Sequence, residues 1–351
     1  MPLTLVVPEL IWPEPDDRAT LDDLSCPGLT ALLARSRLTQ RPPQSFEATL
    51  TDLFGIAGSA AYAAFRALGE EHGPPEARAC WVCADPVHLR LHQERLILAE
   101  GSRLAIERAE AEAIVGDLNR HFANVGRFHA VTPERWYLEL DDQVDLGHFD
   151  VLPLSAAAGR RVTRQLPETP EARWLRQLLV EAQMILHRHP ANEAREAAGQ
   201  STINSLWFWG AGVLPAATVG PFSTVCCRDP LTRGLARASG RPTRRPPETA
   251  EELLVGASDR EHPLVVLDDL QRAVQYEDGA AWRDSLADLE RRWFAPLRAA
   301  LTQRRIRCLR LESSTAYAAL AWESRYFDQW KLWCRARSVA ALAESLGRGE
   351  R

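Results

Sequence analysis

The sequence contains no long apolar run. Its uninterrupted apolar stretches fall well short of the roughly eighteen residues that a membrane-spanning helix needs. The apolar residues between Met1 and Val7 form too short a segment for the core of a secretion signal, and no basic cluster precedes them. We therefore expect a cytoplasmic protein with no membrane partner.

The chain also lacks a strong charge of either sign and a regular set of cysteines. Its net charge is −5, whereas nucleic-acid-binding proteins usually carry a basic excess, so no nucleic-acid partner is expected. The seven cysteines are an odd number, which is typical of a reducing compartment. Cys80 and Cys83 have the spacing of half a zinc or redox site, but only the adjacent Cys226 and Cys227 could complete it. We expect these cysteines to be buried, with no metal and no cofactor.

The length and composition indicate a globular protein with more than one domain. The chain has 351 residues, of which 46% are hydrophobic and 25% charged. Short β-rich runs alternate with helical patterns, which predicts an α/β fold with a mostly parallel sheet flanked by helices. Gly73-Pro74-Pro75 interrupts the chain, and strand patterns surround one helical stripe after it. We predict a core domain from residues 1–75 and 166–351, and an inserted α+β cap from residues 76–165.

Periodicity places the expected elements. The expected strands are Leu3–Val7, Ala79–Val82, Arg95–Ala99, Trp136–Leu140, Ser205–Phe208, Phe222–Cys227, Leu264–Leu267 and Ile306–Leu311. The expected helices cover Leu29–Ala34, Ser59–Glu70, 111–122, Glu171–His189 and 282–297. A last stripe, Trp322, Tyr326, Trp330 and Trp333, predicts an aromatic C-terminal helix that packs on the core or on a partner.

One segment is unusually rich in polar and glycine signals. It reads His189-Pro190-x-Asn192-x-x-Arg195, followed by Asn204 and by Trp209-Gly210-x-Gly212. An arginine beside such a turn can bind a phosphate or carboxylate through two hydrogen bonds, and glycines let backbone amides approach an anion. The alternative is a helix stop followed by a capped helix, with Arg195 on a solvated face. The two interpretations stay open at this point.

This segment resembles the series found in archaeal-type, cofactor-independent phosphoglycerate mutases, which belong to the alkaline phosphatase superfamily. The whole chain resembles more closely the bacterial RpfE-type regulatory proteins, a family related to those mutases. The closer resemblance rests on Asp85–Arg90, Leu118–Phe122 and Pro133–Leu138. It implies an alkaline-phosphatase-like core, a cap domain and a regulatory role.

The resemblance also implies a chemistry that this chain is not equipped to perform. Phosphoryl transfer in that superfamily uses two divalent metals held by Asp and His, and a Ser or Thr nucleophile. No histidine follows His262 in this sequence. The family's ligand, nucleophile-neighbour and substrate-arginine positions are occupied here by Pro8, Phe46, Trp209, Arg272 and Ser313. We therefore expect a catalytically degenerate protein that regulates or senses a ligand.

Two other hypotheses remain. The first is an active metal-dependent mutase or phosphatase with repositioned groups, namely Glu9, Ser45, Asp268, Asp269 and Glu312. The second is a scaffold protein, a homodimer or a complex with another protein, assembled through the aromatic C-terminal helix.

Polar residues on a predicted strand complete the candidate site. Asp85, His88 and Arg90 lie close together in the sequence, and His88, Arg90 and His92 would share one face of an extended strand. They could contact a ligand between cap and core, although a plain surface face is the commoner meaning of such a pattern. With His189, Asn192, Arg195, Asn204, Trp209, Gly210 and Gly212, they form the expected site for a small phosphorylated or anionic ligand.

Overall fold

A computed structural model describes residues 1–56, 61–71, 79–92, 95–141, 151–159, 161–162, 173–215, 220–331, 333–334 and 337–348. The chain forms two compact units. Unit 1 comprises Met1–Gly55, Val219–Asp229 and Ser239–Arg351, and unit 2 comprises Ile56–Thr218 and Pro230–Ala238. Each unit has its own sheet and is described by itself.

Unit 1 is built on a mostly parallel sheet. Within the described residues its strand order is β10-β9-β11-β1-β12-β13-β2. The first five strands are parallel, and β13 and β2 continue the sheet in antiparallel fashion. Strand β1 lies between β11 and β12, with Leu5 opposite Val265 on one side and Leu311 on the other. The carboxyl ends of β9, β11, β1 and β12 therefore meet at one edge.

The strands of unit 1 are β1 (Pro2–Val6), β2 (Arg37–Arg41), β9 (Thr224–Cys226), β10 (Thr243–Arg244), β11 (Pro263–Val266), β12 (Cys308–Ser314) and β13 (Ala319–Arg325). Its helices are α1 (Arg18–Leu21), α2 (Pro27–Arg35), α3 (Phe46–Leu53), α11 (Ala250–Leu254), α12 (Gln271–Gln275), α13 (Gly279–Leu289), α14 (Ala295–Thr302) and α15 (Val339–Gly347). A π-helical turn, η1 (Glu290–Phe294), joins α13 to α14, and η2 (Tyr326–Trp330) is a short 3₁₀ helix.

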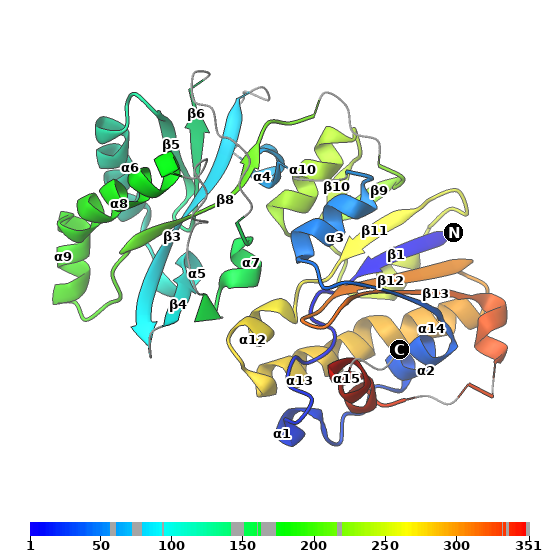
Figure 1. Cartoon of the computed structure of the whole chain (residues 1–351). Coiled ribbons are helices and arrows are strands. Elements are labelled where there is room, and N and C mark those ends of the chain that lie inside the picture. Colours follow the sequence, from blue (N-terminus) through cyan, green and yellow to red (C-terminus); the bar gives the residue numbers. More distant parts are fainter. Residues whose placement is uncertain are drawn as a thin grey trace. The chain divides into compact units, whose positions relative to one another are not determined.

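One face of the unit 1 sheet carries the main hydrophobic core. Leu3, Leu5 and Leu311 alternate toward it, because successive strand residues point to opposite faces. Figure 1 shows helices α2, α13, α14 and α15 along this side of the sheet, and their apolar residues belong to the same cluster. The core fixes the sheet and hence the edge at which its strands end.

A buried glutamate fixes the start of helix α2. Pro27 begins this helix, and its N-cap residue Cys26 supplies no side-chain hydrogen bond. Instead Glu290, which is 7% exposed, accepts hydrogen bonds from the backbone nitrogens of Gly28 at 2.6 Å and Leu29 at 2.9 Å. A negative carboxylate is favourable at the positive end of a helix. Glu290 thereby joins η1 to α2.

Unit 2 is built on an antiparallel sheet. Within the described residues the strand order is β5-β6-β3-β4-β7, and β8 also pairs with β3 outside this order. The long strand β3 therefore organises the sheet, since it pairs with β6, β4 and β8. Trp81 and Val87 mark the two ends of its pairing with β8.

The strands of unit 2 are β3 (Cys80–His92), β4 (Arg95–Glu100), β5 (Gly126–Thr132), β6 (Arg135–Leu140), β7 (Arg161–Val162) and β8 (Ser205–Gly212). Its helices are α4 (Tyr62–Gly69), α5 (Gly101–Leu104), α6 (Arg108–His121), α7 (Leu154–Ala157), α8 (Arg173–His187), α9 (Pro190–Ala197) and α10 (Pro230–Ala238).

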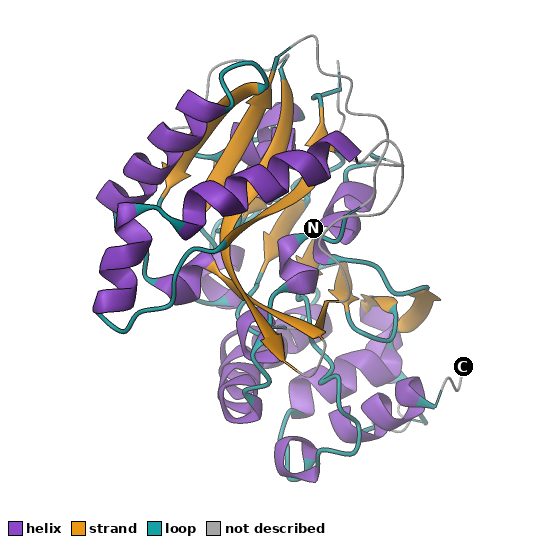
Figure 2. Cartoon of the chain, turned by 60° about the vertical axis from the view of Figure 1, so that its left-hand side comes forward, coloured by secondary structure: helices purple, strands orange, loops and turns teal. Residues whose placement is uncertain are grey.

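Both faces of the unit 2 sheet are covered. Helices α6 and α8 pack on one face through residues such as Ile114 and Leu178, and Figure 2 shows helices lying across the strands there. Helix α4 packs on the other face, next to Trp81 and Trp209. The sheet is therefore buried between α6 and α8 on one face and α4 on the other.

The predicted fold class is confirmed, since a mostly parallel sheet with flanking helices is accompanied by a second, antiparallel sheet. The structure divides the chain at other positions than the predicted residues 75 and 165. Strand β8 pairs with β3, so the segment 173–212 lies in unit 2. Helix α10 also joins unit 2, because a Cβ atom at Gly234 would lie 1.6 Å from the Phe65 carbonyl oxygen of α4.

The predicted aromatic C-terminal helix is wrong. Trp322 lies in strand β13 opposite Leu311 and is 2% exposed. Tyr326 and Trp330 belong to the short 3₁₀ helix η2 that follows. No helix in the described residues is long and apolar enough to cross a membrane.

We expect Glu290→Gln to destabilise unit 1 by about 2 kcal/mol, because an amide would confront buried N–H donors with its own donors. Urea unfolding followed by tryptophan fluorescence measures the change. Glu251→Gln is the matched control, since its ion pair with Arg305 is half exposed and contributes little. Equal stability of Glu290→Gln and the wild type would contradict the helix-anchoring role.

Candidate functional site

The carboxyl edge of the unit 1 sheet holds the acids of the active-enzyme hypothesis. Asp268 and Asp269 follow β11, and Arg228 follows the neighbouring parallel strand β9. The Nη1 atom of Arg228 lies 3.3 Å from Oδ1 of Asp268 and 3.4 Å from Oδ2 of Asp269. Burial raises the pKa of the Asp268 carboxyl, and the charge of Asp229 raises this pKa further. One guanidinium therefore lies at ion-pair distance from both carboxylates and would compete with a cation for them.

Glu312 is also paired with arginine. Its side chain is fully buried in strand β12. Its Oε1 atom accepts a hydrogen bond from Nε of Arg310 at 2.7 Å, and Nη2 of Arg41 lies 3.5 Å from its Oε2 atom. Two arginines thus hold the one carboxylate.

Glu9 and Ser45 have structural roles. Glu9 follows β1 at a positive φ of 56°, and its backbone nitrogen and oxygen bond Ser314 and Trp282. The Ser45 hydroxyl caps helix α3 by accepting from the Ala48 nitrogen at 3.1 Å. Across the part of the chain that the structure describes, no group of three or more His, Cys, Asp and Glu residues could hold a metal ion.

The second candidate region is the polar segment of unit 2. Arg195 in α9 is 2% exposed. Its Nε donates to the Ser201 carbonyl at 2.7 Å, its Nη1 lies 2.9 Å from Oε2 of Glu110, and its Nη2 donates to the Leu104 carbonyl. Every guanidinium nitrogen therefore already donates within unit 2. Neither expectation for Arg195, an anion grip or a solvated residue, describes this buried clamp.

His189 and Asn192 shape the turn between α8 and α9. The Nδ1 atom of His189 accepts from the Ala191 nitrogen at 3.1 Å and caps α9. Asn192 donates to the carbonyls of Leu186 and Ile203 at 2.8 and 2.7 Å, and it accepts from the Ile203 nitrogen at 2.8 Å. These hydrogen bonds satisfy buried backbone groups that would otherwise be costly.

Asn204 completes the edge of strand β3. Its side-chain amide accepts from the Leu89 nitrogen at 2.7 Å and donates to the Leu89 oxygen at 2.9 Å, beyond the point where β8 begins. The nearby His88 ring bonds the Thr202 carbonyl at 2.8 Å, whereas Arg90 is exposed. The side chain of His92 lies outside the described residues.

Asp85 forms a buried ion pair with Arg66, and Trp209 donates a hydrogen bond to it. The sequence patterns did not predict this pair. Arg66 of α4 donates to both oxygens of Asp85, at 2.7 and 2.9 Å, and Nε1 of Trp209 donates to Asp85 at 2.9 Å. Although burial disfavours its charge, Asp85 raises the pKa of Arg66 well above its ordinary value. The guanidinium carbon of Arg66 also lies 5.1 Å from the centre of the Tyr137 ring.

Gly210 and Gly212 allow α4 to approach strand β8. Gly210 has φ +66°, and a Cβ atom there would lie 2.8 Å from Cβ of Tyr62. A Cβ atom at Gly212 would lie 2.7 Å from Cβ of Ala61. Their role is thus close packing around the Arg66–Asp85 pair.

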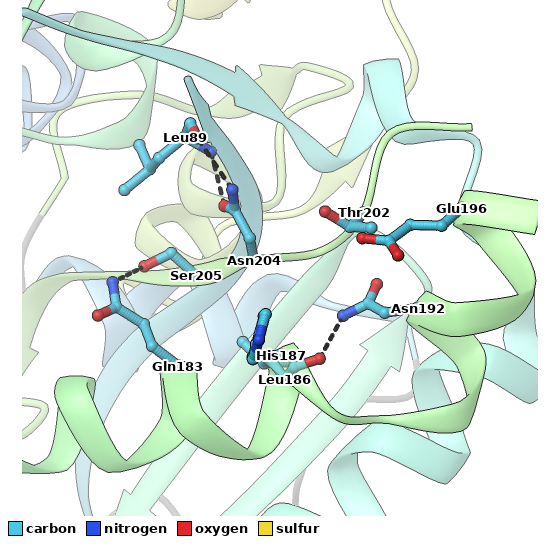
Figure 3. Close-up of a pocket in the computed structure, with 9 residues that line it drawn as sticks. All are labelled: Leu89, Gln183, Leu186, His187, Asn192, Glu196, Thr202, Asn204 and Ser205. Atoms are coloured by element: carbon cyan, nitrogen blue, oxygen red, sulfur yellow. Dashed lines mark hydrogen bonds between the residues drawn. The ribbon is translucent and has the colours of Figure 1, made fainter. Parts of the chain in front are cut away.

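Unit 2 contains a pocket of about 480 Å³ between β3, α8 and α9 (Figure 3). Asn192 and Asn204, two of the predicted site residues, line it. The other lining residues are Leu89, Gln183, Leu186, His187, Glu196, Thr202 and Ser205. Glu196 follows Asn192 by one helical turn, and that spacing could have indicated it from the sequence. The structure brings together only part of the expected site.

Comparison with known proteins gives a partial relationship. The chain matches no family model. It is 31% identical over 121 residues to 2,3-bisphosphoglycerate-independent phosphoglycerate mutase 2 of Methanothermobacter thermautotrophicus, covering 34% of this chain and 29% of the relative. It is 30% identical over 60 residues to 2,3-bisphosphoglycerate-independent phosphoglycerate mutase of Methanosarcina mazei, covering 17% of this chain and 15% of the relative. The chain is therefore related to the archaeal cofactor-independent mutases, over less than a third of these relatives' length.

Two solved structures resemble the fold. The cofactor-independent phosphoglycerate mutase from Thermoplasma acidophilum is 17% identical, with a TM-score of 0.48 over 98% of this chain and 97% of that chain. The PH0037 protein from Pyrococcus horikoshii is 15% identical, with a TM-score of 0.55 over 92% of this chain and 87% of that chain. The second likeness supports the α/β fold.

We expect Arg195→Ala to destabilise unit 2 by about 3 kcal/mol in the absence of any ligand, because Glu110 and two carbonyls lose a buried partner. Urea unfolding measures this loss. Arg188→Ala is the control, because Arg188 is exposed. If Arg195→Ala kept wild-type stability, the clamp described above would be wrong.

Proposed function

We propose that this protein is a catalytically inactive relative of the cofactor-independent phosphoglycerate mutases that senses a small ligand in unit 2. The observation that carries the proposal is the position of Arg228 between Asp268 and Asp269. A regulatory role is what the resemblance to RpfE-type proteins implies.

The donor groups present do not fit the two-metal chemistry that the resemblance implies. A divalent ion needs carboxylates whose negative charge is available to it. Here Arg228 lies at ion-pair distance from both Asp268 and Asp269 and offsets one of their two negative charges, while Arg310 and Arg41 lie at hydrogen-bond or ion-pair distance from Glu312. The Ser45 hydroxyl, the nucleophile of the rival hypothesis, is oriented by its backbone N-cap bond instead.

The pocket of unit 2 supports the sensing part of the proposal. Its polar walls are held by hydrogen bonds between protein groups, such as the one from Gln183 to Ser205 at 2.9 Å (Figure 3). A pre-formed pocket loses less conformational entropy on binding. Its volume of about 480 Å³ falls in the usual range for small-molecule sites.

We expect wild-type protein to bind Mn²⁺ weakly and without fixed stoichiometry, and Arg228→Ala to bind it at least about tenfold more tightly. The substitution removes the cation that competes for Asp268 and Asp269. Isothermal titration with MnCl₂ measures both affinities, and Arg245→Ala, an exposed arginine in the loop after β10, is the control. Tight stoichiometric binding to the wild type would favour the active-enzyme hypothesis instead.

Assembly through the C-terminal region is a second candidate function, favoured by a specific observation. Phe327, Trp330 and Trp333 are 78%, 60% and 77% exposed. Phe327 and Trp330 are three residues apart in a 3₁₀ helix, so they project from the same side. Neighbouring exposed aromatic residues are typical of protein interfaces.

If these aromatics join two copies of the chain, the double substitution Trp330→Ser with Trp333→Ser should halve the mass measured by light scattering. Val255→Ser is the control, because Val255 is 80% exposed but lies at the end of α11. A wild-type mass equal to that of one chain would rule out this assembly.

A further inference from the structure

The pocket between β3, α8 and α9 has an uneven charge. Glu196 is the one acid among its nine described lining residues, and none of the nine is Lys or Arg. Glu196 is exposed, and its carboxylate makes no hydrogen bond or ion pair with the described residues. Figure 3 shows this side chain beside Thr202, facing the pocket. The pocket therefore presents a carboxylate with no lysine or arginine in its described lining, and His187 is its one other titratable side chain.

The position of Glu196 on its helix adds to the negative electrostatic potential of the pocket. Helix α9 ends at Ala197, so Glu196 lies in its last turn, where the helix dipole places partial negative charge. Acids are unfavourable at that end of a helix, and cations are favourable. Arg195, the adjacent arginine, is buried and directed to Glu110 and backbone carbonyls instead. A bound cation would offset the excess of negative charge at the end of α9.

The remaining walls restrict how a ligand can bind. The side-chain amide of Asn204 is hydrogen-bonded to the backbone of Leu89, and that of Asn192 to the backbone of Leu186 and Ile203. Leu89 and Leu186 add apolar surface. Because these amides are engaged, the charge of Glu196 is the strongest recognition element that the described lining offers.

We propose that this pocket binds a small organic cation, an amine or guanidinium compound with a short aliphatic body, whose charged group pairs with Glu196. The inference rests on the sensing part of the proposed function and names its ligand class. It replaces the anionic ligand expected from the sequence. A phosphate would meet Glu196 and the negative end of α9, and the described lining residues include no lysine or arginine and only His187 as a basic side chain.

The test uses 1,4-diaminobutane as the probe and the full chain labelled with ¹⁵N. The side-chain amide signals of Asn192 and Asn204 report directly on the pocket, since both residues line it. The diamine should shift these signals saturably, whereas uncharged 1,4-butanediol and 3-phosphoglycerate should not. Glu196→Gln should weaken diamine binding roughly tenfold.

Glu193→Gln is the matched control, because Glu193 is an exposed acid of the same helix that does not line the pocket. It should leave diamine binding unchanged. Equal weakening by both substitutions would overturn the inference, since it would show unspecific charge attraction. Saturable shifts of the same amide signals with 3-phosphoglycerate but not with the diamine would also overturn it. Neither result would alter Mn²⁺ binding, so failure here is separate from failure of the inactive-enzyme proposal.

Discussion

Arginine–carboxylate pairing is the interaction on which both units of this protein depend. Moving a charge out of water is costly, and a carboxylate in a sheet or between layers needs a partner with matching geometry. The planar guanidinium supplies it, as the two hydrogen bonds from Arg66 to Asp85 illustrate. Arg195 pairs with Glu110 through its Nη1 atom alone, and Arg310 pairs with one oxygen of Glu312.

The same pairing has opposite consequences in the two units. At the carboxyl edge of the unit 1 sheet, it places Arg228 within ion-pair distance of Asp268 and Asp269, the aspartates of the active-enzyme hypothesis. In unit 2 it engages Arg195 in the interior and leaves Glu196 facing the pocket. The chain thereby has arginine-paired acids at the carboxyl edge of one sheet and an acid without an arginine partner beside the pocket of the other unit.

Local patterns predicted the parts of the fold that depend on local packing. The helical stripe from Ala111 to Phe122 is helix α6 followed by its cap, and the alternation from Trp136 to Leu140 is strand β6. Strand β2 was missed, because its residues Arg37–Arg41 are largely exposed and show no apolar alternation. The spacing of Trp322 and Tyr326 also suits a helix, although Trp322 packs within a strand.

Distant partners decided what the sequence could not show. The pairing of β8 with β3 joins residues more than a hundred positions apart. It places β8 in unit 2, whereas the predicted cap ended at residue 165. The burial of Arg195 depends on Glu110 in another helix. Asn192 and Asn204, which were predicted to bind a ligand, line a pocket, and that ligand role stays a prediction. The charge of the pocket depends on Glu196 and on the pairing of Arg195 with Glu110.

Turnover of 3-phosphoglycerate in the presence of Mn²⁺ tests the central claim most directly. The archaeal relative from Methanothermobacter thermautotrophicus provides the positive control under the same conditions. The account predicts no 2-phosphoglycerate above the enzyme-free background, for the wild type and for Ser45→Ala alike. Turnover by the wild type that Ser45→Ala abolishes would contradict it.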